Sequence, residues 1–390
     1  MKTTIYQLFV RHFGNLKTSG REGGDIEENG CGKFADITDS ALLEIKNLGF
    51  THVWLTGILE HASGTAYPDR PADDAKVLKG IAGSPYAVRD YFDVSPDLAV
   101  NVEKRIDEFE ELIKRCHKAR LLVLIDFIPN HVARSYASDV RPHESFGKDD
   151  NVKAFCNLDN SFYYLQGDQP LELPGGIYNA ETHPRVTGNN AANHRPTKDD
   201  WYETVKLNYG YDFTNREKLF SGDQIPKTWS LMDSILSYWQ QLGVDGFRCD
   251  MAHMVPMEFW KWAVDRARNR STNVYFLAEA YAGDMMRVTD GNVLKELLSS
   301  GFDEVYDSSS YDLVKGIYED GKWANDLDNL LWDLERLHKM TRYMENHDEV
   351  RIASPQHWGG HGAKIGMAVS GFLFGIGAGG CLFYNGQEVG

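Results

Sequence analysis

Charged side chains follow apolar runs at four separate places in the sequence. The run "LLVLIDF" contains Asp126, and "VDGFRCD" ends in Asp250, two residues after Arg248. Glu279 lies in "VYFLAEA" and Asp348 in "YMENHDE". A single aspartate after a strand is often only a helix cap. The recurrence of the pattern on four predicted strands indicates instead that these side chains meet in one site.

The types of these residues indicate acid and nucleophile chemistry. Arg248 and Asp250 are two apart, so on a strand they point to the same face. The arginine is expected to lower the pKa of Asp250 and keep it ionised, whereas an apolar setting is expected to raise the pKa of Glu279. One carboxylate and one carboxylic acid about 5–5.5 Å apart can cleave a glycosidic bond with retention. Cys249 is expected to face the helices as a packing residue.

The elements that would position these groups alternate regularly. Strands are predicted at 4–10, 51–57, 121–127, 244–250, 273–280, 302–307, 341–348 and 379–386. Helices are predicted at 40–50, 102–121, 229–243, 256–270, 292–301 and 324–341, with a glycine-rich helix from 365. Strands apolar on both faces are typical of a parallel sheet. The even repeat favours an α/β fold of the (β/α)8 TIM barrel type, whose strand carboxyl ends share one mouth. An open doubly wound sheet is the alternative, but its Gly-x-Gly-x-x-Gly fingerprint is absent.

Residues 132–205 interrupt this repeat. They are rich in Asn, Asp, Gly, Pro and Tyr and contain no long periodic segment. Since a structureless loop of this length is uncommon in a compact domain, we predict an inserted domain at 132–205. Residues 1–131 and 206–390 would then form the barrel.

The composition and net charge limit the classes of binding partner that the protein could have. The net charge of −16 argues against nucleic acid and anionic membranes. The five cysteines are widely spaced and contain no Cys-x-x-Cys pair, which favours a reducing, cytoplasmic location. A secreted protein without its signal peptide would look the same. The uncharged stretch from Ile365 is long enough to span a membrane, but its glycines favour a buried helix, a turn and a strand.

The sequence resembles glycoside hydrolase family 13, the α-amylase family, in four stretches. "DFIPNH", "GFRCD", "FLAEA" and "ENHDE" are similar to the four signature regions of that family, in the same order. The resemblance implies a barrel with a domain B after the third strand. It also implies retaining hydrolysis of α-1,4-glucosidic bonds in starch, glycogen or maltodextrins, without an organic cofactor. The family's eighth helix and C-terminal β-sandwich domain would follow Gly390 and are absent from this chain.

The same resemblance implies residue roles. Asp250 would be the nucleophile, Glu279 the general acid/base and Asp348 the third carboxylate, which distorts the sugar. Substrate contacts or support of the site would come from Tyr86, Asp90, Asp126, His131, Arg248, His253 and His347. Asn130 would be a ligand if structural Ca²⁺ is bound, but a purely structural hydrogen-bonding role for Asn130 is equally open, because no Asp-x-Asp-x-Asp loop is present.

Some features depart from the family pattern. Ser84 stands where many members have a histidine, and His253 where many have a lysine, which leaves acceptor preference open. A transglycosylase with the same site is an alternative function. A catalytically inactive carbohydrate-binding barrel is a further alternative, although all three carboxylates are present. The linkage, endo or exo action and oligomeric state stay open.

Overall fold

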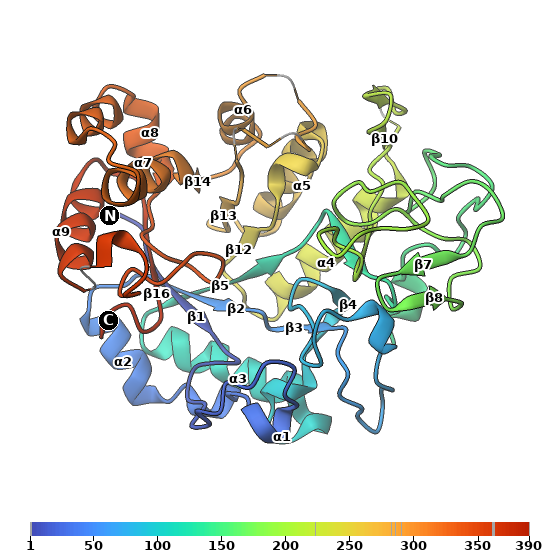
Figure 1. Ribbon diagram of the computed structural model, residues 1–390, viewed down its shortest axis with the longest axis horizontal. Coiled ribbons are helices and arrows are strands. Elements are labelled where there is room, and N and C mark those ends of the chain that lie inside the picture. Colours follow the sequence, from blue (N-terminus) through green and yellow to red (C-terminus); the bar gives the residue numbers. More distant parts are fainter. Residues whose placement is uncertain are drawn as a thin grey trace.

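Parallel strands form a barrel in the computed structural model, which describes residues 2–222, 224–281, 283–284, 286–289, 291–360 and 363–389. Within these ranges the barrel has eight strands: β1 (Thr4–Phe9), β2 (His52–Thr56), β5 (Leu122–Phe127), β12 (Gly246–Cys249), β13 (Tyr275–Ala278), β14 (Glu304–Tyr306), β15 (Met340–Thr341) and β16 (Cys381–Tyr384). β16 pairs in parallel with β1. A parallel bridge between Arg342 and Cys381 joins the remaining two edges. The predicted (β/α)8 barrel is thereby confirmed (Figure 1).

Alternate side chains of the strands enter two different buried clusters. Trp54 and Leu124 belong to one cluster with Ile5, Leu277 and Leu382 of other barrel strands, whereas their neighbours Val53 and Val123 belong to a second cluster. This alternation follows from the two-residue period of a strand. Burial on both faces explains why these strands read as unbroken apolar runs.

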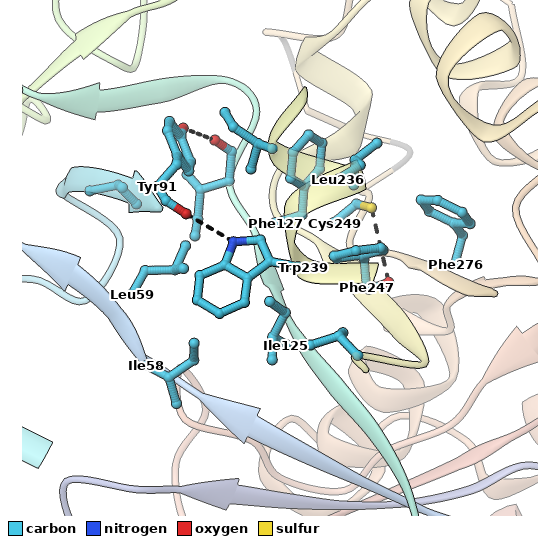
Figure 2. Close-up of a cluster of buried hydrophobic side chains, with 14 of the residues drawn as sticks. Ile58, Leu59, Tyr91, Ile125, Phe127, Leu236, Trp239, Phe247, Cys249 and Phe276 are labelled. Carbon is cyan, nitrogen blue, oxygen red and sulfur yellow. Dashed lines mark hydrogen bonds between the residues drawn. The ribbon is translucent and has the colours of Figure 1, made fainter. Parts of the chain in front are cut away.

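The cluster that contains Val53 and Val123 extends between the barrel and helix α4 (Lys227–Gln241), as Figure 2 shows. Trp239 of α4 packs among Ile58, Leu59 and Ile125, and its indole N–H donates to the Tyr91 carbonyl at 2.9 Å. Cys249 is drawn in the same cluster and is fully buried. The prediction that Cys249 faces the helices is therefore confirmed.

Helices surround the strands on the outside of the barrel (Figure 1). Besides α4 they are the short α1 (Ile26–Asn29), α2 (Asp39–Asn47), α3 (Arg105–Lys118), α5 (Met257–Arg270), α6 (Val293–Ser299), α7 (Ser308–Glu319), α8 (Leu334–Lys339) and α9 (Ala363–Gly375). α3 shows why the periodic pattern was informative. Its buried Phe109, Leu112, Ile113 and Cys116 follow the spacing of one helical face.

Two segments differ from the predicted elements. Helix α7 was not predicted, because its start is serine-rich; it begins where the Asp307 side chain accepts a hydrogen bond from the Ser310 N–H. The helix predicted at 324–341 is divided into a 3-10 helix at Ala324–Leu331 and α8, and strand β15 follows. The Asn and Asp side chains of "ANDLDN" compete with helical backbone bonds, which explains the break.

The insertion after β5 lies at one side of the barrel, in green in Figure 1. Its entry strand β6 (His131–Ala133) pairs antiparallel with its exit strand β9 (Thr204–Lys206). It also contains the hairpin of β7 (Leu171–Leu173) and β8 (Gly176–Tyr178). A pair of two-residue strands follows, β10 (Tyr211–Asp212) and β11 (Glu217–Lys218). The predicted limits of the inserted domain, residues 132 and 205, stay a prediction.

A further antiparallel pair lies between β2 and α3 in the chain. It consists of β3 (Leu59–His61) and β4 (Val88–Val94), and the loop before β4 carries Tyr86. Gly83 in this loop has a φ of +69°, and a Cβ there would lie 1.7 Å from the Ala62 carbonyl oxygen. Only glycine can therefore occupy this position without moving the loop that places Tyr86.

The long apolar stretch from Ile365 does not form one helix. It contains most of α9, which has 13 residues, and then β16. No helix in the described parts of the chain has both the length and the apolar character needed to cross a membrane.

Candidate active site

Arg248 lies at the centre of a buried group of carboxylates at the mouth of the barrel. Its Nη1 is 2.8 Å from Asp250 Oδ1 and 3.5 Å from Asp126 Oδ1, and its Nη2 is 2.8 Å from Glu279 Oε1. The residues come from β12, β5 and the end of β13, and parallel pairing of these strands aligns them. The structure therefore brings together charged residues that lie more than one hundred positions apart.

The pKa shifts of Asp250 and Glu279 have directions opposite to those expected from the sequence. Burial, followed by the neighbouring Glu279 carboxylate, raises the pKa of Asp250 well above its usual value, although Arg248 opposes the shift. Burial also acts to raise the pKa of Glu279, but Arg248 and the hydrogen bond from the Met251 N–H outweigh it, so this pKa is lowered. The expected directions were wrong for the protein without substrate.

The reason is the distribution of hydrogen-bond donors. Glu279 Oε2 accepts from the Met251 N–H at 2.9 Å, and Oε1 accepts from the Tyr281 hydroxyl at 3.1 Å. Asp250 Oδ2 is buried and has no hydrogen-bond partner. Since donors favour the charged form of a carboxyl group, this difference explains why the pKa of Glu279 is lowered while that of Asp250 is raised. The sequence alone predicted that Arg248 would pair with Asp250, its neighbour on the strand. In the structure the guanidinium is equally close to the carboxyl groups of Asp250 and Glu279.

A cavity of about 390 Å³ opens above these groups. Its lining residues include the predicted Tyr86, His131, Asp250, Glu279 and Asp348. The others are Lys79, Ser84, Met251, Trp201, Glu203, Thr204 and Tyr281. The Asp348 side chain is about half exposed, at 53%. Burial, followed by the Glu279 carboxylate, raises the pKa of Asp348 to about 6.

Asp126 and His347 lie behind the cavity lining and support it. Asp126 accepts from the Gly57 N–H at 3.0 Å and contacts Arg248, and burial raises its pKa to about 6. His347 Nδ1 hydrogen-bonds Gln7 Nε2 at 2.8 Å, and its Nε2 hydrogen-bonds the Tyr86 hydroxyl at 2.6 Å. The Tyr86 and His347 rings stack with centroids 5.3 Å apart. Both nitrogens of His347 thus have protein partners, which fixes Tyr86.

Asp90 and His253 do not line the cavity. Asp90 is buried on β4 and accepts from the N–H groups of Phe92 and Asp139, so it orders the backbone of the insertion. His253 is also fully buried, and its Nε2 lies 2.9 Å from Asp284 Oδ2. The resemblance made Asp90 a supporting residue, which fits this position, and His253 a contact to the sugar, which stays a prediction because His253 is buried outside the cavity lining.

The residues around Asn130 do not fit a calcium site. Asn130 Oδ1, the oxygen that would bind the ion, accepts a hydrogen bond from Lys206 Nζ at 2.5 Å. Its Nδ2 donates to the Gly188 carbonyl at 2.9 Å. Burial lowers the pKa of Lys206 to about 7, and both side chains are buried. Because an ammonium group takes the position of a cation, we assign Asn130 a structural role that joins the barrel to the insertion.

This geometry predicts insensitivity to calcium. Thermal unfolding of the protein should give the same Tm, within about 1 °C, in 5 mM CaCl2 as in 5 mM EDTA, since a ligand stabilises only a fold that binds it. Differential scanning fluorimetry measures this directly. A rise of several degrees with CaCl2 that is reversed by EDTA and lost in Asn130→Ala, but kept when Glu60 of the separate Glu60, Asp93 and Asp139 group is changed to Gln, would contradict the assignment of Asn130.

Several cavity residues were not found from the sequence. Tyr281 lies two residues after Glu279, so strand periodicity could have placed it on the same face. Trp201 and Glu203 come from the insertion, where no periodic pattern was readable. Met251 has a φ of +44°, a left-handed conformation that is uncommon for a residue other than glycine. This conformation accompanies the hydrogen bond from its N–H to Glu279.

Comparison with known proteins agrees with the fold. The chain is 24% identical over 398 residues to the α-amylase MalA of Haloarcula japonica, which covers 100% of this chain and 44% of that protein. It is 23% identical to the α-1,4-glucan:maltose-1-phosphate maltosyltransferase of Picrophilus torridus, covering 80% of this chain and 37% of that one. The chain thus spans less than half the length of these relatives.

A solved structure gives the same result for the architecture alone. The cyclic α-maltosyl-(1→6)-maltose hydrolase of Arthrobacter globiformis superposes with a TM-score of 0.66 at 19% identity, covering 100% of this chain and 74% of that chain. Residues 7–390 match the family model described as the α-amylase catalytic domain. The chain therefore belongs to the α-amylase catalytic-domain family.

Proposed function

We propose that the protein is a retaining α-glycoside hydrolase that cleaves α-1,4-glucosidic bonds in starch, glycogen or maltodextrins. One observation carries this proposal: the carboxyl groups of Asp250 and Glu279 both lie 2.8 Å from the same guanidinium, at the wall of an open cavity. Asp250 Oδ2 is buried and has no hydrogen-bond partner among the described residues, so no described group competes for its lone pairs. Two carboxyl groups in this relation can serve as nucleophile and acid.

The proposed reaction has two steps. Asp250 Oδ2 attacks the anomeric carbon, and Glu279 gives its proton to the departing glycosidic oxygen, which leaves a glycosyl ester on Asp250. Glu279, now a carboxylate, then removes a proton from water, which attacks the ester and restores Asp250. The first step requires an ionised Asp250 and a protonated Glu279, which is the reverse of the pKa directions in the protein without substrate. Asp348 would hydrogen-bond the sugar hydroxyls from the other side of the cavity.

The substrate class follows from the cavity and the charge. Tyr86, Trp201 and Tyr281 offer aromatic surface, which suits the apolar face of a pyranose ring. A net charge of −16 suits a neutral polyol better than an anionic ligand. The names of the two relatives, an α-amylase and an α-glucan maltosyltransferase, support an α-glucan substrate. The cytoplasmic location stays a prediction.

A substrate panel tests the proposal. Starch, maltotriose, pullulan, isomaltose, trehalose and sucrose should be assayed for reducing sugar or glucose release, with the anomer of the first product followed by NMR. We expect release from starch and maltotriose, with an α-configured first product, because two displacements restore the configuration. A β-configured first product would contradict the retaining mechanism. Activity confined to isomaltose, trehalose or sucrose would contradict the proposed linkage.

A second candidate is an α-glucan transglycosylase with the same intermediate. The similarity to a maltosyltransferase over 80% of the chain favours keeping it. At high maltotriose concentration, a transglycosylase forms oligosaccharides longer than the one supplied, and a hydrolase forms only shorter ones. Product chromatography at 1 mM and 100 mM maltotriose distinguishes the two. Binding of maltotriose without any turnover would instead favour an inactive carbohydrate-binding barrel.

A further inference from the structure

A tyrosine hydroxyl contacts Glu279 inside the cavity. Tyr281 lines the cavity, and its hydroxyl donates to Glu279 Oε1 at 3.1 Å. The same oxygen lies 2.8 Å from Arg248 Nη2, and the other carboxyl oxygen accepts from the Met251 N–H. Glu279 is thus held at both oxygens. Tyr281 is not among the residues that the sequence motifs indicated.

The three partners of Glu279 differ in what they can offer. A backbone N–H and a guanidinium can only donate, so they can bind an oxygen of either form but cannot accept a hydrogen bond from the O–H of the carboxylic acid. A tyrosine hydroxyl can donate to the carboxylate or accept from the protonated acid after rotating its own proton. Among the described neighbours that hydrogen-bond Glu279, Tyr281 is the one suited to both forms.

The ring of Tyr281 is held in place by its surroundings. It lies edge-on to the His253 imidazole, with ring centroids 5.9 Å apart. His253 is in turn bound through Nε2 to Asp284 Oδ2 at 2.9 Å. The buried His253 therefore packs against the Tyr281 ring, on a side that does not line the cavity.

We propose that Tyr281 is a positioning residue that keeps Glu279 in place through both protonation states of the acid/base cycle. The inference rests on the proposed function, because it assigns Glu279 the role of acid and base. The other titratable and charged groups around Glu279 are Arg248 and Asp250 from β12, Asp126 from β5, His131 from β6, Tyr306 from β14, and Tyr343, His347 and Asp348 after β15.

The test is Tyr281→Phe, assayed on two substrates. Maltotriose has a poor leaving group that needs a proton, whereas a 2-chloro-4-nitrophenyl maltotrioside has one that leaves without it. We expect kcat on maltotriose to fall about tenfold, with KM within about twofold of wild type. The fall on the aryl substrate should be much smaller, because its bond cleavage does not depend on the acid.

The pH profile gives an independent readout. The Tyr281 hydroxyl acts with Arg248 and the Met251 N–H to lower the pKa of Glu279 against the effect of burial. Its removal therefore raises that pKa, and the basic limb of kcat/KM on maltotriose should move to higher pH in Tyr281→Phe. A residue that only stacks on the sugar would change KM on both substrates and leave the limb in place.

Tyr136→Phe is the matched control. The Tyr136 hydroxyl is buried without a hydrogen-bond partner, so its removal should leave both substrates and the pH profile unchanged. If the wild type is active, two results for Tyr281→Phe would overturn this inference while leaving the proposed function intact. They are an equal loss of kcat on both substrates and an unshifted basic limb of the pH profile. A wild type inactive on both substrates would overturn the proposed function and this inference with it.

Discussion

Asp250→Asn should reduce kcat on maltotriose by at least roughly 10³-fold. An amide oxygen is a far weaker nucleophile than a carboxylate and cannot form the ordinary glycosyl ester. Asp250 Oδ2 has no hydrogen-bond partner among the described residues, whereas Asp126 accepts from the Gly57 N–H and Glu279 from the Met251 N–H, so neither of these carboxylates is equally free to replace it. Reducing-sugar release over several hours, at enzyme concentrations high enough to detect slow turnover, measures the loss.

Stability and a neighbouring variant separate this result from misfolding. The folded-state pKa of Asp250 is raised above its unfolded-state value, so the free energy of unfolding falls as pH rises above the unfolded-state pKa, and this loss is absent below it. Asp250→Asn should thus be as stable as wild type at pH 7 or more so, with the difference shrinking in acid. Cys249→Ala, on the helix-facing side of the same strand, should retain activity. Asp250→Asn with more than a tenth of wild-type activity would refute the role of nucleophile.

Arg248→Met should lower the free energy of unfolding by about 3–5 kcal/mol at neutral pH. The guanidinium is 1% exposed and lies within 3.5 Å of Asp126, Asp250 and Glu279. Removing it leaves three buried carboxyl groups without their common cation. Burial of an uncompensated charge is among the most destabilising changes known in a folded protein, and activity should be lost as well.

The pH dependence of this loss identifies its cause. Without Arg248, the folded-state pKa values of Asp126 and Asp250 rise further above their unfolded values, and Glu279 loses the cation that lowers its pKa. The free energy of unfolding therefore falls as pH rises above the unfolded-state pKa values of these groups. Urea unfolding should show a smaller deficit at pH 5 than at pH 7.5. Adding Asp250→Asn to Arg248→Met should restore part of the stability at pH 7.5, because the two residues are in contact. A deficit equal at both pH values would indicate lost packing rather than lost charge compensation.

The barrel and its polar strand ends could be predicted from the sequence because both depend on short-range patterns. Apolar runs mark strands buried on both faces, and residues such as Asp126 and Asp250 stand where those runs end. The order of strands then follows from the repeat. The unpredicted α7 shows the limit of this reasoning, since its buried Tyr311 and Val314 stand in a segment with a serine-rich start and an internal glycine.

The detailed site could not be predicted because it depends on contacts between distant residues. Lys206 and Asn130 are 76 residues apart, and nothing in either segment indicates that they meet. The sequence also did not indicate the contact between Arg248 and Glu279, which lowers the pKa of Glu279 where a raised pKa was expected. His253 was assigned to the substrate by its place in a motif, whereas its partner Asp284 lies on a later loop.

The contact between Lys206 and Asn130 also has a consequence for the conditions under which the protein can work. A cation carried by the polypeptide cannot be lost by dilution or withdrawn by other ion-binding molecules, so we expect that the contact between Lys206 and Asn130 forms without a bound metal ion. Its charge depends instead on acidity, because the pKa of Lys206 is lowered to about 7. Above that value a neutral amine can still donate its hydrogen bond, and the link between the two parts of the chain persists.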